Sequence, residues 1–389
     1  MVTLRRFLRD LSLPAVVAGF VAVLVGFTSS VAIVFQAAQA FGATPAQTAS
    51  WMWALGLGMG GTSIVLSLWA RQPVLTAWST PGAALLAATS GITMPEAIGA
   101  FLVTGGLIVV AGATGWFERI MDRIPVAVAS ALLAGVLARF GLDAVLAARS
   151  APLLVGVMAL TYLAARRWWP RYAVPLVLVA GVAVAAAQGQ LHLGSVAWDW
   201  ARPVFTAPTF SMAALVGVAL PLFLVTMASQ NLPGVVAQRA SGYDAPISRS
   251  ITVTGAATVL LAPFGGYALN LAAITAAICM GREAHEDPAR RYTAAVMAGL
   301  FYVAIGLAGG AVVGLLTAFP RELVAAVAGL ALLGTIATGL AHALKEEAHR
   351  DAAIVTFLVT LSGLTVLGIG SAFWGVMAGA AALGFGRRG

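Results

Sequence analysis

The sequence is dominated by a series of apolar segments, most of them close in length to what a helix needs to cross a bilayer. Such a helix requires about 20 mostly apolar residues. Of the 389 residues, 60% are hydrophobic and only 9% are charged. Soluble domains carry about 25% charged residues, so this few charges could not cover the surface of a soluble protein of this size. The sequence therefore predicts an all-α polytopic membrane protein embedded in lipid.

We expect about fourteen transmembrane segments. The first is too long for the apolar core of a signal peptide, which has about 7–15 residues, so we expect it to be retained as a span. The approximate bounds of the fourteen are 11–35, 46–69, 74–89, 95–117, 124–140, 151–165, 173–189, 211–238, 245–262, 264–280, 292–316, 321–343, 351–367 and 372–386.

The basic residues alternate with these segments. If the N-terminus is cytoplasmic, 18 of the 22 Lys and Arg residues fall in cytoplasmic connections, as the positive-inside rule requires. The exceptions are Arg139, Arg149, Arg202 and Arg321. This pattern favours an even number of spans with both termini in the cytoplasm. It also explains the net charge of +8 without a nucleic-acid partner, since no recognition motif accompanies the charge.

Two of the segments do not resemble continuous helices. Residues 72–87 begin with a β-prone stretch between two prolines, and then offer Ser79 or Thr80 as a helix N-cap and Pro81 as a first helical residue, followed by Gly82. Residues 262–275 repeat this order, with Asn270 as the expected cap. The sequence thus predicts a short extended strand followed by a half-helix in each.

The two interrupted segments are the third and the tenth, each the third of a set of seven, and they enter from opposite sides. This arrangement predicts a 7 + 7 inverted repeat. Irregular backbone at membrane depth is tolerated where it is buried by protein or lines a cavity, and paired interruptions indicate a transporter binding site. Two half-helix N-termini that meet there would favour an anion. The alternative is that both segments are simple kinks or turns.

Polar side chains within the apolar segments are the next candidates. Gln230 and Asn231 must find hydrogen-bond partners, which are either the substrate or another helix. Ser29 and Ser30 hold the matching place in the first repeat, although serine more often bonds to its own helix backbone. We expect no ionisable group at mid-membrane, so a proton relay is not evident.

Glycines at intervals of four residues are expected to let helices approach closely. They are Gly56 and Gly60 in the second segment, and Gly306, Gly310 and Gly314 in the eleventh. The single cysteine, Cys279, excludes a disulfide framework and gives no metal-binding spacing. Because the segments contain no catalytic cluster either, we expect neither an enzyme nor a bound metal or cofactor.

Several stretches, taken together, resemble the bacterial benzoate/proton symporters of the BenE type across essentially the whole chain. They are Leu13–Phe20, Phe35–Ala40, Thr76–Leu85 and Ser229–Gly234. The resemblance implies the 7 + 7 inverted-repeat fold of uracil permeases and sulfate-type anion exchangers, in the bacterial inner membrane. It implies a core domain of residues 1–123 and 209–319, a gate domain of residues 124–208 and 320–389, and substrate between them. Relatives of this fold suggest a homodimer through the gate domain, with a monomer as the alternative.

The chain departs from the uracil permeases at two positions. In the resemblance, the uracil permeases carry a glutamate at the position of Gln230. They carry a second glutamate at the position of Leu269, just before Asn270. An amide and an apolar residue suit an aromatic carboxylate better than a nucleobase, which needs hydrogen-bond acceptors. The same replacements remove the obvious proton site.

The resemblance thus implies a secondary active transporter that imports benzoate with protons by alternating access. We expect the carboxylate near Ser79, Thr80, Pro81, Gly82 and Asn270, with Gln230 donating a hydrogen bond. Further contacts are expected from Phe264, Tyr267, Leu269 and Trp78 around the ring, and from Asn231, Ser29 and Ser30 nearby. The alternatives are a carrier or exchanger for another small organic or inorganic anion or a nucleobase, and a channel.

Overall fold

The structure is a computed structural model, and it describes residues 4–87, 89–122, 124–191, 200–244, 246–308, 319–364, 366 and 371–386. Most of the helices form two bundles. The larger bundle contains α2 (Leu13–Ala40), α3 (Pro45–Ala70), α4 (Thr80–Ala87), α5 (Met94–Ala113), α13 (Ile247–Leu261), α14 (Ile274–Met280) and α15 (Tyr292–Ala308). Helices of the smaller bundle are α7 (Val126–Ala147), α8 (Pro152–Trp168), α9 (Ala173–Ala187), α17 (Arg321–Ala343), α18 (Arg350–Leu361) and α19 (Ser371–Gly386). Shorter helices are α1 (Leu4–Asp10), α6 (Trp116–Met121), η1 (Pro170–Tyr172), η5 (Ala262–Phe264), η6 (Pro288–Arg290) and η7 (Glu347–His349).

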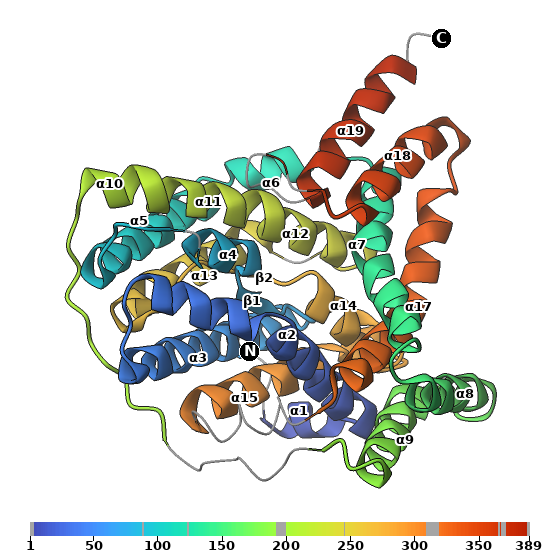
Figure 1. Ribbon diagram of the computed structural model, residues 1–389. Helices are drawn as coiled ribbons and strands as arrows, with labels where there is room; N and C mark the ends of the chain where they lie inside the picture. The colour runs from blue at the N-terminus through green and yellow to red at the C-terminus, as the bar shows by residue number, and fades with distance from the viewer. Residues whose placement is uncertain are drawn as a thin grey trace.

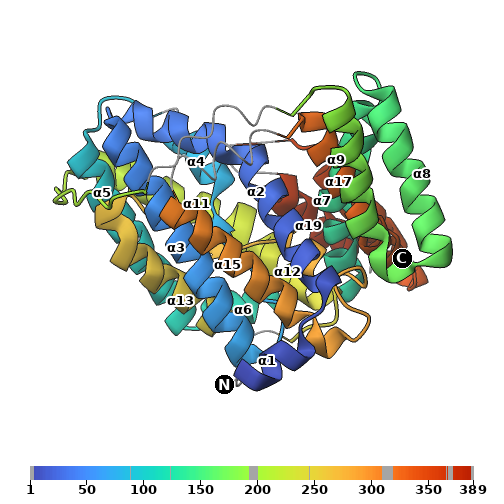
Figure 2. The same cartoon turned by 90° about the horizontal axis from the view of Figure 1, so that it is seen from below.

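The two bundles lie side by side. In Figure 1 the larger bundle occupies the left and the smaller one the right, and Figure 2 shows the same separation from below. Within the larger bundle α3 packs along α15, and α5 packs along α13. Within the smaller bundle α7 packs along α17, and α18 packs along α19. Each bundle therefore combines segments from both halves of the sequence.

The membrane character of the chain is clear from its helices. Six of the described helices are long and apolar enough to cross a bilayer, or up to eight if each of two bent pairs is one span. The count of fourteen crossings stays a prediction. Several expected boundaries are wrong: α2 continues to Ala40 and not 35, α7 continues to Ala147 and not 140, and α18 ends at Leu361 and not 367.

At the centre of the larger bundle two three-residue strands pair. Strand β1 (Thr76–Trp78) runs antiparallel to β2 (Leu269–Leu271), with Ala77 opposite Asn270. Helix α4 follows β1 and helix α14 follows β2, which confirms a strand and a half-helix in both interrupted segments. Asn270 is not the predicted helix cap, because it lies within β2 and α14 begins only at Ile274.

Hydroxyl groups from neighbouring helices complete the hydrogen bonding of the strands. The Ser63 hydroxyl of α3 accepts a bond from the Thr76 amide at 3.0 Å. The Thr258 hydroxyl of α13 accepts one from the Leu269 amide, also at 3.0 Å. Buried backbone groups need such partners, above all where no water competes. The helices that flank the strands thus hold them in the bundle.

The helix from residue 212 to residue 240 widens twice along its length. Its parts are α10 (Met212–Ala214), the π-helical turn η3 (Leu215–Ala219), α11 (Leu220–Thr226), the π-helical turn η4 (Met227–Asn231) and α12 (Leu232–Ala240). A proline ring clashes with the carbonyl four residues earlier. For Pro221 and Pro233 these residues are Gly217 and Ser229, each in the middle of a π-helical turn. The helix is therefore distorted beside Pro233, as the place of that proline in the sequence requires.

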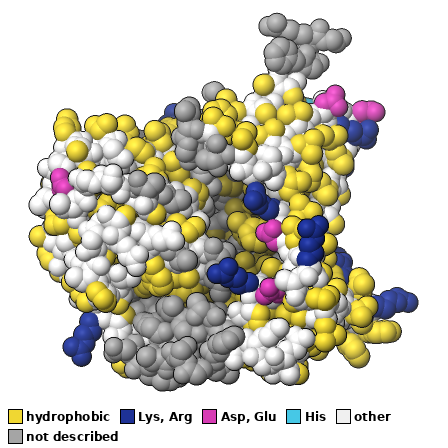
Figure 3. Space-filling view, in the orientation of Figure 1, with side chains coloured by type: hydrophobic (Ala, Val, Ile, Leu, Met, Phe, Trp, Pro, Cys, Tyr) yellow, Lys and Arg dark blue, Asp and Glu magenta, His cyan; other side chains and the backbone are white. Residues whose placement is uncertain are grey.

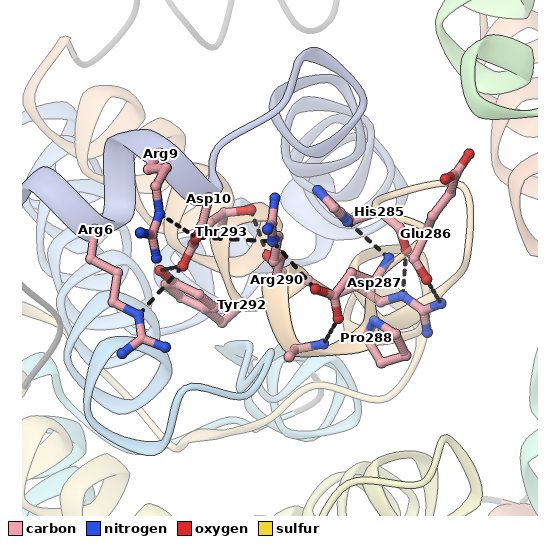
Figure 4. Close-up of polar contacts among 12 residues, drawn as sticks. Arg6, Arg9, Asp10, His285, Glu286, Asp287, Pro288, Arg290, Tyr292 and Thr293 are labelled. Carbon is pink, nitrogen blue, oxygen red and sulfur yellow. Dashed lines mark hydrogen bonds and ion pairs between the residues drawn. The ribbon is translucent and has the colours of Figure 1, made fainter.

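A buried carboxylate connects the N-terminal segment to the start of α15, as Figure 4 shows. Helix α1 is bent by 92° from the first part of α2. Asp10, at the end of α1, accepts a hydrogen bond from the Tyr292 hydroxyl at 3.0 Å. It also lies 3.8 Å from the Arg6 guanidinium and 3.9 Å from that of Arg290. Basic residues predicted to share one side of the membrane thus meet around one acid.

Glycines allow α3 and α15 to approach each other closely. A Cβ atom on Gly56 would lie 2.6 Å from the Cα of Gly306, and one on Gly60 would lie 2.5 Å from the carbonyl oxygen of Gly299. The predicted packing role of Gly56, Gly60 and Gly306 is confirmed. Gly310 and Gly314 lie outside the described residues.

This contact yields a paired stability test. Gly60→Ala should lower the Tm in detergent, because the new methyl group meets backbone, and overpacking costs about 1–3 kcal/mol. Gly61→Ala is the control, since nothing lies within 4 Å of its Cβ position and alanine favours a helix over glycine by about 1 kcal/mol. Equal Tm values for the two variants would contradict the assigned packing.

Candidate functional site

A cavity of about 720 Å³ lies between the two bundles. Its wall on the larger bundle comes from α2, α3, β1, the start of α4, η4 and the segment that follows β2. Residues on this wall include Ser30, Ile33, Met59, Trp78, Thr80, Pro81, Gln230 and Ile274. Its wall on the smaller bundle includes Gly135, Val136, Arg139, Phe140, Thr360, Gly363 and Ser371. The cavity thus lies at the boundary between segments that are far apart in the sequence.

Trp78 forms a fixed part of the wall. Its indole N–H donates to the Ser30 hydroxyl at 2.9 Å, and that hydroxyl donates in turn to the carbonyl of Gly26 at 3.0 Å. Ser30 therefore lines the cavity, and it also bonds to its own helix, as serine commonly does. The side chain of Ser29 lies outside the described residues.

Gln230 offers an amide to the cavity. It is half-buried in the π-helical turn η4 and forms no hydrogen bond with the described part of the chain. Such an amide can donate up to two hydrogen bonds from its NH2 group and accept others at its oxygen without breaking an existing contact. Single-turn π segments occur often at functional sites, and here the turn places Gln230 on the cavity wall.

The start of α4 presents fewer free donors than expected. Ser79 is fully buried, and its hydroxyl accepts from the Gly82 amide at 3.1 Å, so Ser79 acts as the N-cap. Pro81 has no N–H, and Gly82 is buried against Ser79. Among the first three residues of α4, only Thr80 keeps a free backbone N–H, together with its hydroxyl. Thr80 and Pro81 line the cavity, whereas Ser79 and Gly82 do not.

The two asparagines hold the strands together and do not line the cavity. The Asn231 side-chain oxygen accepts from the Leu271 amide at 2.9 Å, so this residue joins η4 to β2. The Asn270 side-chain N–H donates to the Ala268 carbonyl at 3.0 Å. Both side chains are fully buried. Of the two alternatives for Asn231, substrate or protein, the structure shows the protein contact.

Three of the predicted ring contacts lie away from the cavity. Tyr267 is fully buried with its ring 5.8 Å from that of Trp51, and the ring of Phe264 lies 5.6 Å from that of Trp53. Leu269 is fully buried within β2. Neighbouring strand residues point to opposite faces, so the side chains around Asn270 cannot all face one cavity. Trp78 is the predicted ring contact that lines it.

Arg139 is the residue that sequence analysis missed. It was expected at the end of the fifth segment, 124–140, but α7 continues to Ala147, and Arg139 is exposed and lines the cavity. It is the one charged residue among the described residues that line this cavity. The expectation of no ionisable group at mid-membrane overlooked this arginine in the interior of a long apolar helix. A signal was present, since the residues after Arg139 stay largely apolar up to Ala147, with Asp143 as the exception.

A second hollow, of about 700 Å³, also lies between the bundles. It is rich in charged residues, namely Arg166, Arg239, Arg282, Glu283, Glu286 and Arg291. Figure 3 shows basic and acidic side chains gathered in the hollow between the two bundles. These residues come from connections predicted to be cytoplasmic, in contrast to the largely apolar lining of the first cavity.

Comparisons with known proteins agree with this architecture. The family model described as benzoate membrane transport protein (BenE) matches residues 9–385. The inner membrane protein YdcO of Escherichia coli is 52% identical over 367 residues, which are 94% of each chain. The benzoate membrane transport protein of Acinetobacter baylyi is 42% identical over 381 residues, which are 97% of each chain.

Among solved structures, that of SLC26A9 is similar with a TM-score of 0.50 at 12% identity, over 98% of this chain and 66% of that one. This likeness concerns the fold alone and supports the inverted-repeat class. The family match across nearly the whole chain and the two relatives lead to one conclusion: the chain belongs to the BenE family of membrane transport proteins, which are transporters and not enzymes.

Proposed function

We propose that the chain transports benzoate across the bacterial inner membrane. The observation that carries this proposal is the cavity between the bundles, which combines apolar walls with a few polar groups, as small-molecule sites do. The name of the Acinetobacter relative supports benzoate as the substrate, and that of the Escherichia relative supports the inner membrane.

In this proposal the aromatic ring lies against Trp78 and the apolar lining beside it. Met59, on the same wall, and Phe140, on the smaller bundle, supply further apolar surface. The Gln230 amide and the Thr80 hydroxyl would donate to the carboxylate. Ser79, Asn231 and Asn270 would act indirectly, because their side chains already bond within the protein and hold α4 and the strands in place.

We further infer that transport proceeds by alternating access. The larger bundle would be the core domain, residues 1–123 and 209–319, and the smaller one the gate domain, residues 124–208 and 320–389. A site between two bundles can be opened to either side when one bundle moves against the other. Exposed leucines on α8, such as Leu153 and Leu160, give the gate domain an apolar outer face for lipid or for a second copy in a homodimer.

Both termini are proposed to be cytoplasmic. Two contacts support this topology by joining connections that the positive-inside rule assigns to one side. The Arg290 guanidinium meets Asp10 near the N-terminus, and the Arg239 guanidinium lies 2.5 Å from a carboxylate oxygen of Asp122.

Proton symport is the remaining part of the proposal. The described residues that line the cavity include no carboxylate and no histidine. The proton would therefore enter on benzoic acid or on a group outside this lining. An inward proton gradient should drive accumulation in either case.

Proteoliposomes provide the direct test. Radiolabelled benzoate should accumulate when the outside is more acidic than the inside, and a proton-conducting uncoupler should abolish the accumulation. Because neutral benzoic acid also crosses lipid unaided, protein-free liposomes are the control. Uptake no greater than in that control would refute transport, and carrier-dependent uptake that ignores the gradient would refute symport. Competition by uracil or sulfate but not by salicylate would point to the alternative substrates.

Gln230→Ala tests the contact on the larger bundle. It should weaken benzoate binding about three- to tenfold, which corresponds to the loss of one ordinary hydrogen bond. Gln188→Ala, at the exposed end of α9, is the matched control and should bind as the wild type does. Isothermal titration calorimetry on the purified protein gives both affinities. Unchanged affinity in Gln230→Ala would remove this residue from the site.

A further inference from the structure

Arg139 lies deep within its helix. It is about 20 Å along α7 from Val126, at about 1.5 Å per residue, and the hydrocarbon core of a bilayer is about 30 Å thick. Two further turns follow before α7 ends at Ala147. An ionised side chain at such a depth is costly and usually marks a functional site.

No protein group in the described chain neutralises Arg139. Asp143 lies one turn further along α7, and Glu322 and Asp351 lie near the starts of the helices packed against it, α17 and α18. None of these carboxylates forms an ion pair with Arg139, and Arg139 forms no hydrogen bond with the described residues. Arg139 is instead exposed, and it lines the cavity.

Gly363 leaves the space that the Arg139 side chain occupies. A Cβ atom at residue 363 would collide with the guanidinium. The same residue has φ = 69°, in the left-handed region that favours glycine. The connection after α18 therefore accommodates the extended arginine.

Among the described residues, the opposite wall offers only neutral donors. Thr80 and Gln230 line it from the larger bundle, and Ser79 has already capped the start of α4. A carboxylate is held most strongly by a charged donor, and the two parallel N–H groups of a guanidinium match its two oxygens.

We propose that Arg139 binds the carboxylate of the substrate from the smaller bundle, so that the bound anion joins the two bundles. This inference rests on the proposed function, benzoate transport, and assigns the cation of that site. When the substrate neutralises Arg139, closing the cavity no longer isolates an unpaired charge from water. The loaded carrier therefore closes more readily than the empty one, and a neutral analogue such as benzamide lacks this effect.

Calorimetric titration of the purified full-length protein with benzoate and with benzamide tests the inference. The wild type should prefer benzoate. Arg139→Gln should weaken benzoate binding about ten- to hundredfold, as expected for a hydrogen bond to a charged group, and should leave benzamide binding nearly unchanged. Arg139→Lys should be intermediate, because lysine keeps the charge and loses the paired donors. Arg149→Gln, which lies outside the cavity lining, is the control.

The outcomes separate the two proposals. Wild-type binding of benzoate with equal affinity in Arg139→Gln would overturn the role of Arg139 and leave benzoate transport standing. No benzoate binding by the folded wild type would overturn the proposed function, and the role of Arg139 with it. If Arg139→Gln does not fold, Gly363→Ala replaces it, since it retains the guanidinium but displaces it. Selective loss of benzoate binding in that variant supports the inference, and unchanged benzoate binding overturns it.

Discussion

The fold depends on the pairing of β1 with β2 inside the larger bundle. Six residues, three in each strand, leave the helical conformation at a depth where lipid offers no hydrogen bonds, so protein groups must satisfy their backbone. The strands bond to each other, and Ser63, Thr258 and Asn231 supply partners from three surrounding helical segments. Because both half-helices start within three residues of these strands, the same bonds fix the position of the cavity wall.

The π-helical turn η4 shows how one local distortion assigns different tasks to adjacent amides. Pro233 prevents a regular helical bond to the carbonyl of Ser229, and the helix widens there. Within this turn Asn231 points to β2 and bonds to it, whereas Gln230 faces the cavity. One amide therefore stabilises the strand pair, and its neighbour remains available to a ligand.

The distribution of charge between the bundles has a mechanistic consequence. The larger bundle contributes neutral donors to the cavity. Ser79 and the buried asparagines are not among them, because Ser79 caps α4 and the asparagines bond within the protein. The positive charge, Arg139, comes from the smaller bundle. In the proposed mechanism, the strongest anion site exists only while both walls face the same ligand, which couples binding to the relative position of the bundles.

The sequence by itself determined the membrane character, the two interrupted segments with their strands and half-helices, the distortion beside Pro233 and the glycine contacts of α3, since each depends on composition or on local backbone chemistry. Only the tertiary structure decided which polar residues meet. It assigned Asn231 and Asn270 to the strands, placed Tyr267 and Phe264 away from the cavity, and brought Arg139 into it. The physical reason is that a helix apolar on nearly every face carries no periodic signal that distinguishes lipid, protein and cavity. That distinction arises when segments more than one hundred residues apart pack against each other.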